Sequence, residues 1–502
     1  MRTLPAGFRA YEWAPSTEEL ARRAGLDPVE LVRFDGNVPS LPLPSSRPGA
    51  IAGALADVNT YPHGGYPHIH EAIAAYAGVE PENVVLGAGG DDLIMLCARA
   101  FAGPGDVVAV PPAPTYPLFR VAAELAGATV ADDSPVLNFC CRPGNPLGDL
   151  PPLPDARPLV VDEAYFEYAG ETAVPFLEDG VIVIRTFSKA FALAGARIGY
   201  LLADRDTAAE LRTRQAPAPV STLSVALALA ALRTPPEVRP LLEERERLAG
   251  ELRQLGLEPL PSRANFLFVP TAEPDAIAER LLARRCVVRA TGGGIRITVR
   301  DREDNDLLLA ALAGTEEPQG RRVRHVRATA ETSLRVRLGL DGAGRVRVET
   351  GAGLYDHLLE QLAFHGGLDL LVDGSGDWET GDHHTAEDTA IAFGEALDRA
   401  LGDRRGIARY GSAVVPMDDA LARAAVDLGG RRGAEITLAK DPGLARHTLE
   451  SLAQAARMTL HVDATGRDPH HVAEAAHKAV GRALREAVRR DGAELPSTKG
   501  LL

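Results

Sequence analysis

The sequence predicts an α/β protein of several domains, with a mostly parallel sheet in its N-terminal half and an internal duplication in its C-terminal half. At 502 residues, the chain is too long for one ordinary hydrophobic core. Short apolar runs that suit buried strands alternate with helical segments up to residue 184, a pattern typical of a parallel sheet covered by helices. Two His-His-x-Ala-Glu stretches, which start 87 residues apart at His383 and His470, indicate the duplication.

The amino-acid composition indicates which kinds of partner the protein is expected to bind. Apolar residues make up 45% of the chain and charged residues 25%, as in an ordinary globular protein. The 54 Lys and Arg against 69 Asp and Glu give a net charge of −15, which argues against nucleic acid or an anionic membrane as the main partner. The sequence has no signal core and no apolar run of membrane length, so we expect a cytoplasmic protein. Its four cysteines lack zinc or disulfide spacing, and we expect reduced thiols, mostly in the core.

The sequence predicts that residues 1–34 form an N-terminal arm with little core of its own. They contain a short helix, expected at 17–24, and lead into an extended segment at 34–48 that several prolines interrupt. Further along, a strand at 83–86 ends in a glycine-rich turn, 87–92, before the next helix. Such a turn presents free backbone N–H groups and the positive end of a helix dipole, which suits a phosphate, although a plain strand-to-helix turn has the same composition.

Two later strands, expected at 159–161 and 181–184, end near residues that carry chemistry. Lys189 follows the second strand and is the only lysine among the first 439 residues. Arginine provides the positive charge elsewhere in that span, but its guanidinium cannot serve as the amine of a Schiff base. Asp162 and Tyr165 follow the first strand. Because the carboxyl ends of parallel strands meet at one edge of a sheet, we expect these three side chains to share a ligand site.

These residues form a working set for pyridoxal phosphate. Lys189 would form the Schiff base, Asp162 would keep the pyridine nitrogen protonated, and Tyr165 would hold the ring hydroxyl. Three further side chains suit the cofactor phosphate: Thr186, Ser188 and Arg197. Taken one by one, such residues are often only helix caps or core residues. Their order along the chain favours a cofactor site.

Residues 30–312 resemble histidinol-phosphate aminotransferase, of the fold-type I pyridoxal-phosphate family, most closely at 186–195. The resemblance implies a large cofactor domain at 35–219, a small α/β domain at 220–313, and glutamate as the amino donor. It adds residues that would contact the cofactor: Tyr61 from the partner subunit, Gly90, Asp91, Tyr116 and Asn145. It also implies that Arg289 and Arg296 bind anionic groups of the substrate.

The match to that family is incomplete at three places. Residues 35–39 and 143–148 keep only parts of the family's signatures, and the interval 132–159 is shorter than in the family, apparently without a helix and part of a strand. The N-terminal half could therefore be a catalytically silent module kept for binding, regulation or assembly. It could also catalyse another pyridoxal reaction, such as decarboxylation of a phosphorylated amino acid, because a fold does not determine its chemistry.

A short polar linker at 314–323 precedes the last domain, 324–502, in which histidine is concentrated. Nine of the chain's 13 histidines lie between His357 and His477. A second internal match, at an offset of 90 residues, makes His357 and His447 equivalent. Together with the His-His-x-Ala-Glu repeat, this match predicts two copies of one structural unit.

The repeated histidines predict two metal sites. On a helix, the first His and the Glu of each His-His-x-x-Glu stretch share a face, while the second His points about 100° away. Sites rich in imidazole and carboxylate suit Mn, Fe or Zn better than Ca or Mg. Ordinary surface histidines would not be expected to repeat together. The predicted ligands are His357, His383, His384, Glu387, His447, His470, His471 and Glu474.

The whole last domain resembles imidazoleglycerol-phosphate dehydratase, with matching stretches at 327–332, 382–388, 405–411 and 496–500. The resemblance implies a duplicated α/β sandwich that binds two Mn²⁺ ions, which would hold the imidazole of the substrate as imidazolate. Glu331 would move protons. The substrate phosphate would contact Arg409, Arg431, Ser497 and Lys499.

The two resemblances support each other, because the dehydratase product, imidazole acetol phosphate, is the transaminase substrate. The sequence thus predicts a bifunctional enzyme of histidine biosynthesis that binds small phosphorylated imidazoles and glutamate. The resemblances also imply a homo-oligomer, with dimers formed by the N-terminal half and a larger, trimer-based shell formed by the C-terminal half.

Overall fold

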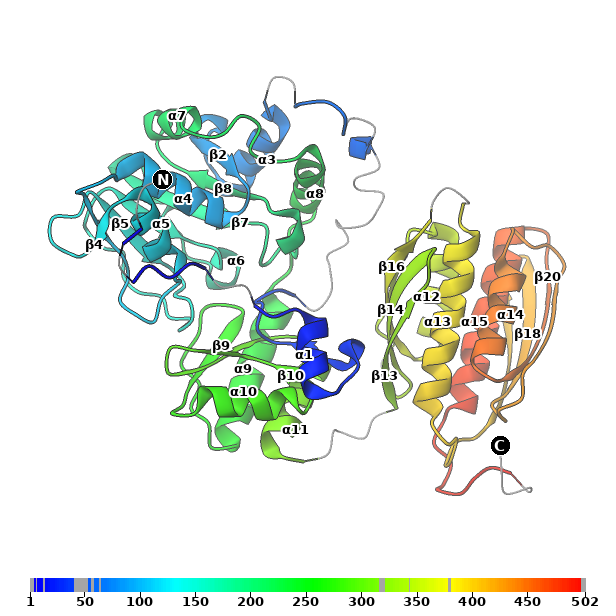
Figure 1. Ribbon diagram of the computed structural model, residues 1–502. Helices are drawn as coiled ribbons and strands as arrows, with labels where there is room; N and C mark the ends of the chain where they lie inside the picture. The colour runs from blue at the N-terminus through cyan, green and yellow to red at the C-terminus, as the bar shows by residue number, and fades with distance from the viewer. Residues whose placement is uncertain are drawn as a thin grey trace. The chain divides into compact units, whose positions relative to one another are not determined.

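The computed structural model describes residues 4–5, 7–11, 14–39, 53–55, 58–62, 65–315, 321–342, 344–377 and 381–497. Its internal contacts divide the chain into two units, Met1–Pro318 and Gln319–Leu502, and this division falls within the linker expected at 314–323 (Figure 1). Residues 40–48 of the expected extended segment, and Lys499, lie outside the described residues. Within the described ranges, no helix is both long enough and apolar enough to cross a membrane.

A seven-stranded sheet forms the centre of the first unit. Strand β8 is antiparallel to its two neighbours and the strands from β7 to β4 are parallel, which confirms the predicted mostly parallel sheet. In spatial order the strands are β2 (Val84–Gly87), β8 (Gly199–Leu202), β7 (Val181–Thr186), β6 (Leu159–Asp162), β5 (Leu137–Cys141), β3 (Val107–Ala109) and β4 (Thr129–Val130).

Helices cover both faces of this sheet. One face packs against α4 (Gly90–Phe101), α5 (Leu118–Ala126) and α7 (Arg205–Thr213), and the other against α3 (Pro67–Ala77) and α8 (Thr222–Arg233). Ile182 and Ile184 of β7 face the first group of helices, whereas Val181 and Val183 face the second. Because the central strands are buried on both faces, they consist of continuous apolar residues.

The connection from β5 to β6 lies in the interval that is shorter than in the resembling family. It contains no helix, as the sequence predicted. The two strands nevertheless pair side by side, from Asn138 with Leu159 to Cys141 with Asp162. The shortening therefore does not interrupt the sheet, and Asp162 keeps its place at the carboxyl edge.

A smaller α/β region completes the first unit around a three-stranded antiparallel sheet. Its strands, in spatial order, are β11 (Arg289–Thr291), β12 (Gly294–Thr298) and β9 (Phe266–Pro270). Its helices are α9 (Arg239–Gln254), α10 (Pro274–Leu282) and α11 (Arg302–Ala313). Apolar residues of this sheet and these helices form one buried cluster, separate from the core of the large sheet.

The N-terminal arm has more core than the sequence predicted. Helix α1 (Thr17–Ala24) buries its apolar face against Leu282 and Val287. Strand β1 (Val32–Arg33) pairs in parallel with β10 (Cys286–Val287). The arm thus shares its core with residues that lie far along the chain and left no signal near residue 34.

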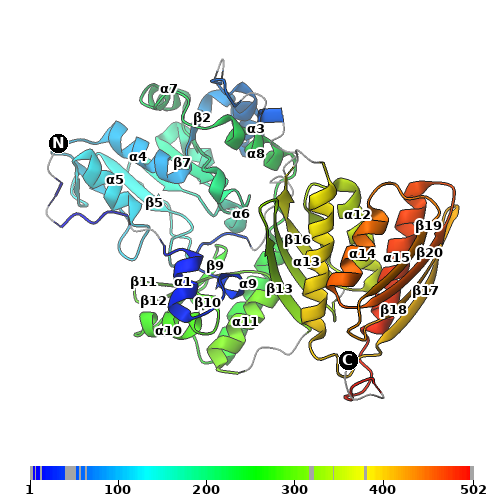
Figure 2. The same cartoon turned by 45° about the vertical axis from the view of Figure 1, so that its right-hand side comes forward.

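The second unit consists of two four-stranded sheets with four helices between them (Figures 1 and 2). Both sheets have the same order of strands, which confirms the predicted duplicated sandwich. The first sheet contains β13 (Arg322–Ala328), β14 (Thr332–Gly339), β16 (Asp369–Gly376) and β15 (Val346–Glu349). The second contains β17 (Tyr410–Met417), β18 (Ala420–Asp427), β20 (Thr459–Thr465) and β19 (Gly433–Leu438).

The four helices pack in pairs that join the two repeats. They are α12 (Gly353–Gly366) and α13 (His383–Leu401) of the first repeat, and α14 (Ala445–Ala455) and α15 (Pro469–Ala487) of the second. Helix α12 packs against α15, and α13 against α14. A Cβ on Gly481 of α15 would lie 2.1 Å from the Leu362 carbonyl oxygen of α12, so this approach requires glycine. Each close pair runs in the same direction, which brings the first turns of its two helices together.

Candidate active sites

The site of the first unit lies at the carboxyl ends of β6 and β7. Lys189 follows the end of β7 by three residues, and its Nζ donates to the Gly36 carbonyl oxygen at 3.2 Å. Burial and the nearby Arg296 guanidinium lower the pKa of Lys189 to about 8. The amine is therefore closer to its neutral form, the nucleophile of Schiff-base chemistry, than the amine of an exposed lysine.

Asp162 and Tyr165 lie at the same edge as Lys189. Burial raises the pKa of Asp162 to about 7, although the Ala164 N–H donates to its Oδ1 at 3.0 Å and acts in the opposite direction. The Tyr165 ring lies 5.7 Å from Lys189 Nζ, and its hydroxyl accepts a hydrogen bond from Asn37 Nδ2 at 2.9 Å. The structure thus brings the three predicted residues together. It adds Asn37, which the sequence reasoning noted only as part of an incomplete signature.

The predicted phosphate contacts gather around the start of α4. Gly89 caps this helix with a φ of 90°, and a Cβ on it would lie 2.8 Å from Arg197 Nη2. Arg197 in turn donates to Asp91 Oδ2 at 3.0 Å. The hydroxyls of Thr186 and Ser188, at the end of β7, bond to each other at 2.9 Å. The N–H groups at the start of α4, the two hydroxyls and the Arg197 guanidinium provide the hydrogen-bond donors that a phosphate needs.

Arg289 and Arg296 form a basic pair beside this edge. They are direct partners across β11 and β12, where like charges destabilise a sheet unless an anion neutralises them. Arg296 donates to Asn145 Oδ1 and to the Asp35 carbonyl oxygen, both at 2.6 Å. Its buried Nε has no hydrogen-bond partner among the described residues. This arrangement suits a substrate anion, and it places Asn145 beside the anion site.

The two remaining predicted cofactor contacts are tyrosines with different surroundings. Tyr116 donates its hydroxyl to Asp91 Oδ1 at 2.8 Å, so it lies with the phosphate contacts. Tyr61 is 82% exposed, and the structure does not bring it to this site. An exposed position leaves Tyr61 accessible to a partner subunit, as the expected contact requires.

The second unit contains two clusters of possible metal ligands, each drawn from both repeats. The Glu474 cluster consists of His357, His470 and Glu474, and the Glu387 cluster consists of His383, Glu387 and His447. Glu474 Oε2 lies 3.1 Å from His470 Nε2 and 3.5 Å from His357 Nε2. Glu387 lies 3.3 Å from His447 Nε2 and 3.7 Å from His383 Nε2. The sequence repeat indicated all six residues. It did not indicate that His357 joins the cluster of the second repeat and His447 that of the first, because this depends on how the helices pair.

His384 and His471 lie outside these clusters, as their offset around the helix predicted. His384 Nδ1 lies 3.1 Å from Asp377 Oδ2 and 3.6 Å from Glu331 Oε2. His471 Nδ1 lies 2.7 Å from Asp419 Oδ1. The carboxylate of Asp377 raises the pKa of His384, and that of Asp419 raises the pKa of His471. The sequence reasoning missed both aspartates, although the repeat signals Asp419, which precedes β18 as Glu331 precedes β14.

Arg409 and Ser497, two of the predicted phosphate ligands of the second unit, lie far from the Glu474 cluster of the same chain. The Arg409 N–H donates to the carbonyl oxygen of Ala487, the last residue of α15, whereas His470 lies in the first turn of that helix. The two ends are about 26 Å apart along the helix. The Arg409 side chain donates to the Pro496 carbonyl oxygen at 2.8 Å, which places Ser497 at the same far end. Arg431 is exposed in the loop after β18.

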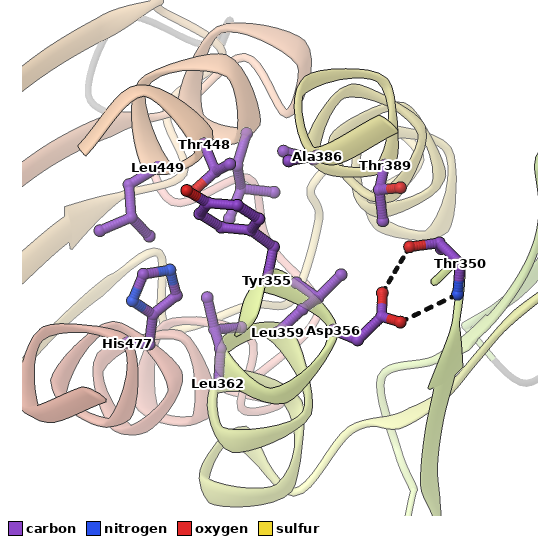
Figure 3. A pocket seen from close by; sticks show the side chains of 12 residues that line it. Thr350, Tyr355, Asp356, Leu359, Leu362, Ala386, Thr389, Thr448, Leu449 and His477 are labelled. Atoms are coloured by element: carbon purple, nitrogen blue, oxygen red, sulfur yellow. Dashed lines mark hydrogen bonds between the residues drawn. The ribbon is translucent and has the colours of Figure 1, made fainter. Parts of the chain in front are cut away.

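A small cavity of about 20 Å³ lies between the helices of the second unit (Figure 3). His477 of α15 and Tyr355 of α12 face each other across it (Figure 3). His477 Nδ1 donates to the Ala473 carbonyl oxygen at 2.8 Å, and burial lowers the pKa of His477 to about 4. His477, one of the nine histidines in the histidine-rich part of the sequence, is therefore buried and neutral and belongs to neither cluster.

The residues present fit both kinds of group that the resemblances imply. In the Glu387 cluster, His447 Nε2 is buried and lacks a hydrogen-bond partner among the described residues, as expected of a nitrogen kept for a ligand. Two imidazoles and one carboxylate in each cluster are donors that suit Mn or Zn. In the first unit, an amine, a buried carboxylate and a cluster of phosphate donors are what pyridoxal phosphate requires.

Comparisons with known sequences agree with this division of the chain. The sequence model described as imidazoleglycerol-phosphate dehydratase matches residues 350–484, and that described as aminotransferase class I and II matches 32–135 and 131–312. The imidazoleglycerol-phosphate dehydratase of Salinispora tropica is 50% identical over 204 residues, which span 36% of this chain and 99% of that protein. The enzyme of the same name from Methanothermobacter thermautotrophicus is 48% identical over 190 residues, which span 36% and 98%.

Solved structures resemble the first unit. The histidinol-phosphate aminotransferase of Sinorhizobium meliloti is 29% identical with a TM-score of 0.54, and the match covers 60% of this chain and 95% of that one. An aspartate aminotransferase of Thermus thermophilus is 24% identical with a TM-score of 0.51, and the match covers 61% and 100%. The second likeness shows the shared fold.

Proposed function

The chain belongs to the imidazoleglycerol-phosphate dehydratase family through its C-terminal unit and to the class I and II aminotransferases through its N-terminal unit, and we propose that it catalyses two consecutive steps of histidine biosynthesis. The C-terminal unit dehydrates imidazoleglycerol phosphate to imidazole acetol phosphate. The N-terminal unit transfers the amino group of glutamate to that product and forms histidinol phosphate. The units follow each other along the chain in the reverse order of the reactions.

The dehydratase assignment is supported by the two ligand clusters built across the repeats. Two Mn²⁺ ions bound there, one in each cluster, would stabilise the imidazole ring of the substrate as an anion. Glu331, beside His384 at the turn between β13 and β14, is the group to which we assign proton movement. Arg409, Arg431, Ser497 and Lys499 would bind the substrate phosphate.

The transaminase assignment is supported by the pairing of Lys189 with Asp162 at the edge of the large sheet. Bound pyridoxal phosphate supplies the electron sink for amino-group transfer. Lys189 would hold the cofactor and move the proton of the substrate's α-carbon, while Asp162 would keep the pyridine nitrogen protonated. Arg289 and Arg296 bind the anionic groups of the substrate. Arg197 and the start of α4 bind the cofactor phosphate.

The far placement of Arg409 supports a homo-oligomer. Since Arg409 and the Glu474 cluster lie at opposite ends of α15, the phosphate-binding residues of one copy would complete a metal cluster of another. His384 and His471, which lie outside the clusters of their own chain, would provide further ligands to such a neighbour. The exposed Tyr61 supports a dimer of the N-terminal unit in the same way. The cytoplasmic location stays a prediction.

An absorbance spectrum and a metal analysis of the purified protein test both assignments. We expect a yellow protein with close to two Mn²⁺ per chain, one for each cluster. Lys189→Ala should lose the visible band and keep the metal. A colourless protein that does not take up added pyridoxal phosphate would contradict the transaminase and favour the silent module, while the dehydratase would stand.

A further inference from the structure

The carboxylate of the Glu474 cluster has a fixed positive charge behind it. Lys478 Nζ lies 2.8 Å from Glu474 Oε1, while Oε2 of the same carboxylate faces His470 and His357. The Glu474 side chain is only 8% exposed, so water screens this charge poorly. An ion that enters this cluster therefore meets a carboxylate that is already neutralised.

Among the described residues, none places such a positive charge at the Glu387 cluster. The residue one turn after Glu387, in the position that Lys478 takes after Glu474, is Ile391. The ion pairs of Glu387 within the described part of the chain are those with His383 and His447, both from the cluster itself. The Glu387 side chain is 34% exposed. Its carboxylate thus keeps its full charge for an ion, although the two clusters are equivalent by the sequence repeat.

We propose that the two clusters bind divalent cations with unequal affinity, so that the Glu387 cluster fills first and Lys478 holds the Glu474 cluster at lower affinity. This inference rests on the proposed metal sites. Lys478 also donates a hydrogen bond that orients the Glu474 carboxylate, and such outer partners of metal ligands usually support binding. The repulsion between an ammonium and a divalent ion at this short range opposes that support and outweighs it. At limiting metal, only one of the two clusters would then be occupied.

A titration of the metal-free full chain with MnCl₂, followed by electron paramagnetic resonance of free Mn²⁺ and by calorimetry, tests this order. We expect two phases whose dissociation constants differ by about tenfold or more, the range over which partners of metal ligands act. Glu387→Gln should remove the tight phase, and Glu474→Gln should remove the weak phase. Two equal phases, or the reverse assignment, would overturn the inference. Absence of Mn²⁺ binding would instead contradict the metal sites themselves.

A reciprocal pair of variants separates the charge of Lys478 from its hydrogen bond. Lys478→Gln keeps a donor but removes the charge, and we expect the weak phase to tighten about tenfold toward the strong one. Ile391→Lys adds the charge to the other cluster and should weaken the tight phase. Thermal unfolding of the metal-free variants checks that both fold. If Lys478→Gln weakens Mn²⁺ binding in a folded protein, the residue only orients Glu474 and the inference is wrong.

Discussion

At the scale of single side chains, Lys189 and Asp162 show how burial changes the acidity of two neighbouring groups. Burial acts on both, but in opposite directions: it lowers the pKa of Lys189 to about 8 and raises that of Asp162 to about 7. Groups with such shifts cluster at catalytic sites, because proton transfer is efficient when the pKa lies near the working pH. The lone lysine of the sequence indicated the position, but only the folded neighbourhood sets its acidity.

The first prediction concerns the uptake of pyridoxal phosphate by Lys189. Only the neutral amine reacts, so the rate of cofactor binding to cofactor-free protein should rise with pH and level off above about 8, well below the 10.5 of an ordinary lysine. Stopped-flow absorbance at the visible band measures this rate. Two alanine variants provide the controls. Lys189→Ala should show no visible band, whereas Lys440→Ala, which changes an exposed lysine, should show an unchanged pH profile. A midpoint near the ordinary lysine value would contradict the buried site.

The second prediction concerns the buried His477. Its folded pKa of about 4 lies below the ordinary 6.5, so the unfolded chain binds a proton that the folded chain excludes between these values. The contribution of His477 to the free energy of unfolding is fully present above pH 6.5. It is lost as the pH falls toward 4, and the total loss is about 3 kcal/mol. Denaturant unfolding of metal-free protein at several pH values measures it. The difference between wild type and His477→Phe should follow this slope, and a difference independent of pH would refute the assignment.

At the scale of secondary-structure elements, sequence patterns predicted what lies within one repeat or one strand. The apolar runs ending near Asp162 and Lys189 predicted a shared sheet edge, and the doubled His-His-x-Ala-Glu stretch predicted a duplicated domain. They could not predict that α12 packs with α15 instead of with its own repeat partner, because that choice depends on glycine contacts between distant helices. The packing of α1 on Leu282 and the approach of Asp377 to His384 also left no local signal. The pairing of Glu474 with Lys478, four residues later on the same helix, could have been predicted from the sequence.

The third prediction tests this helix pairing. A Cβ on Gly481 would lie 2.1 Å from the backbone oxygen of Leu362, so Gly481→Ala must push α15 away from α12. We expect a loss of about 2 kcal/mol or more in the free energy of unfolding, together with loss of Mn²⁺ from the Glu474 cluster but not from the Glu387 cluster. Gly353→Ala, whose Cβ would meet nothing within 4 Å, is the matched control. Unchanged metal stoichiometry in Gly481→Ala would show that the pairing does not form the cluster.

At the scale of the whole molecule, two units with separate cores carry the two proposed activities. Their cores share no residues, so substitutions in one should leave the energetics of the other unchanged. The linker can raise the local concentration of the intermediate, but it does not by itself form a channel. The assembly of copies stays a prediction: in the proposed homo-oligomer, the region around Arg409 would acquire its role from a second chain.

The most direct measurement supplies the intact chain, loaded with Mn²⁺ and pyridoxal phosphate, with imidazoleglycerol phosphate and glutamate, and follows products by mass spectrometry. The account predicts histidinol phosphate and 2-oxoglutarate. Lys189→Ala should stop at imidazole acetol phosphate, and His384→Ala or removal of metal by chelation should abolish dehydration yet leave transamination of supplied imidazole acetol phosphate nearly unchanged. If the wild-type chain itself stops at imidazole acetol phosphate with cofactor saturating, the two-step account is contradicted and the N-terminal unit is not the transaminase.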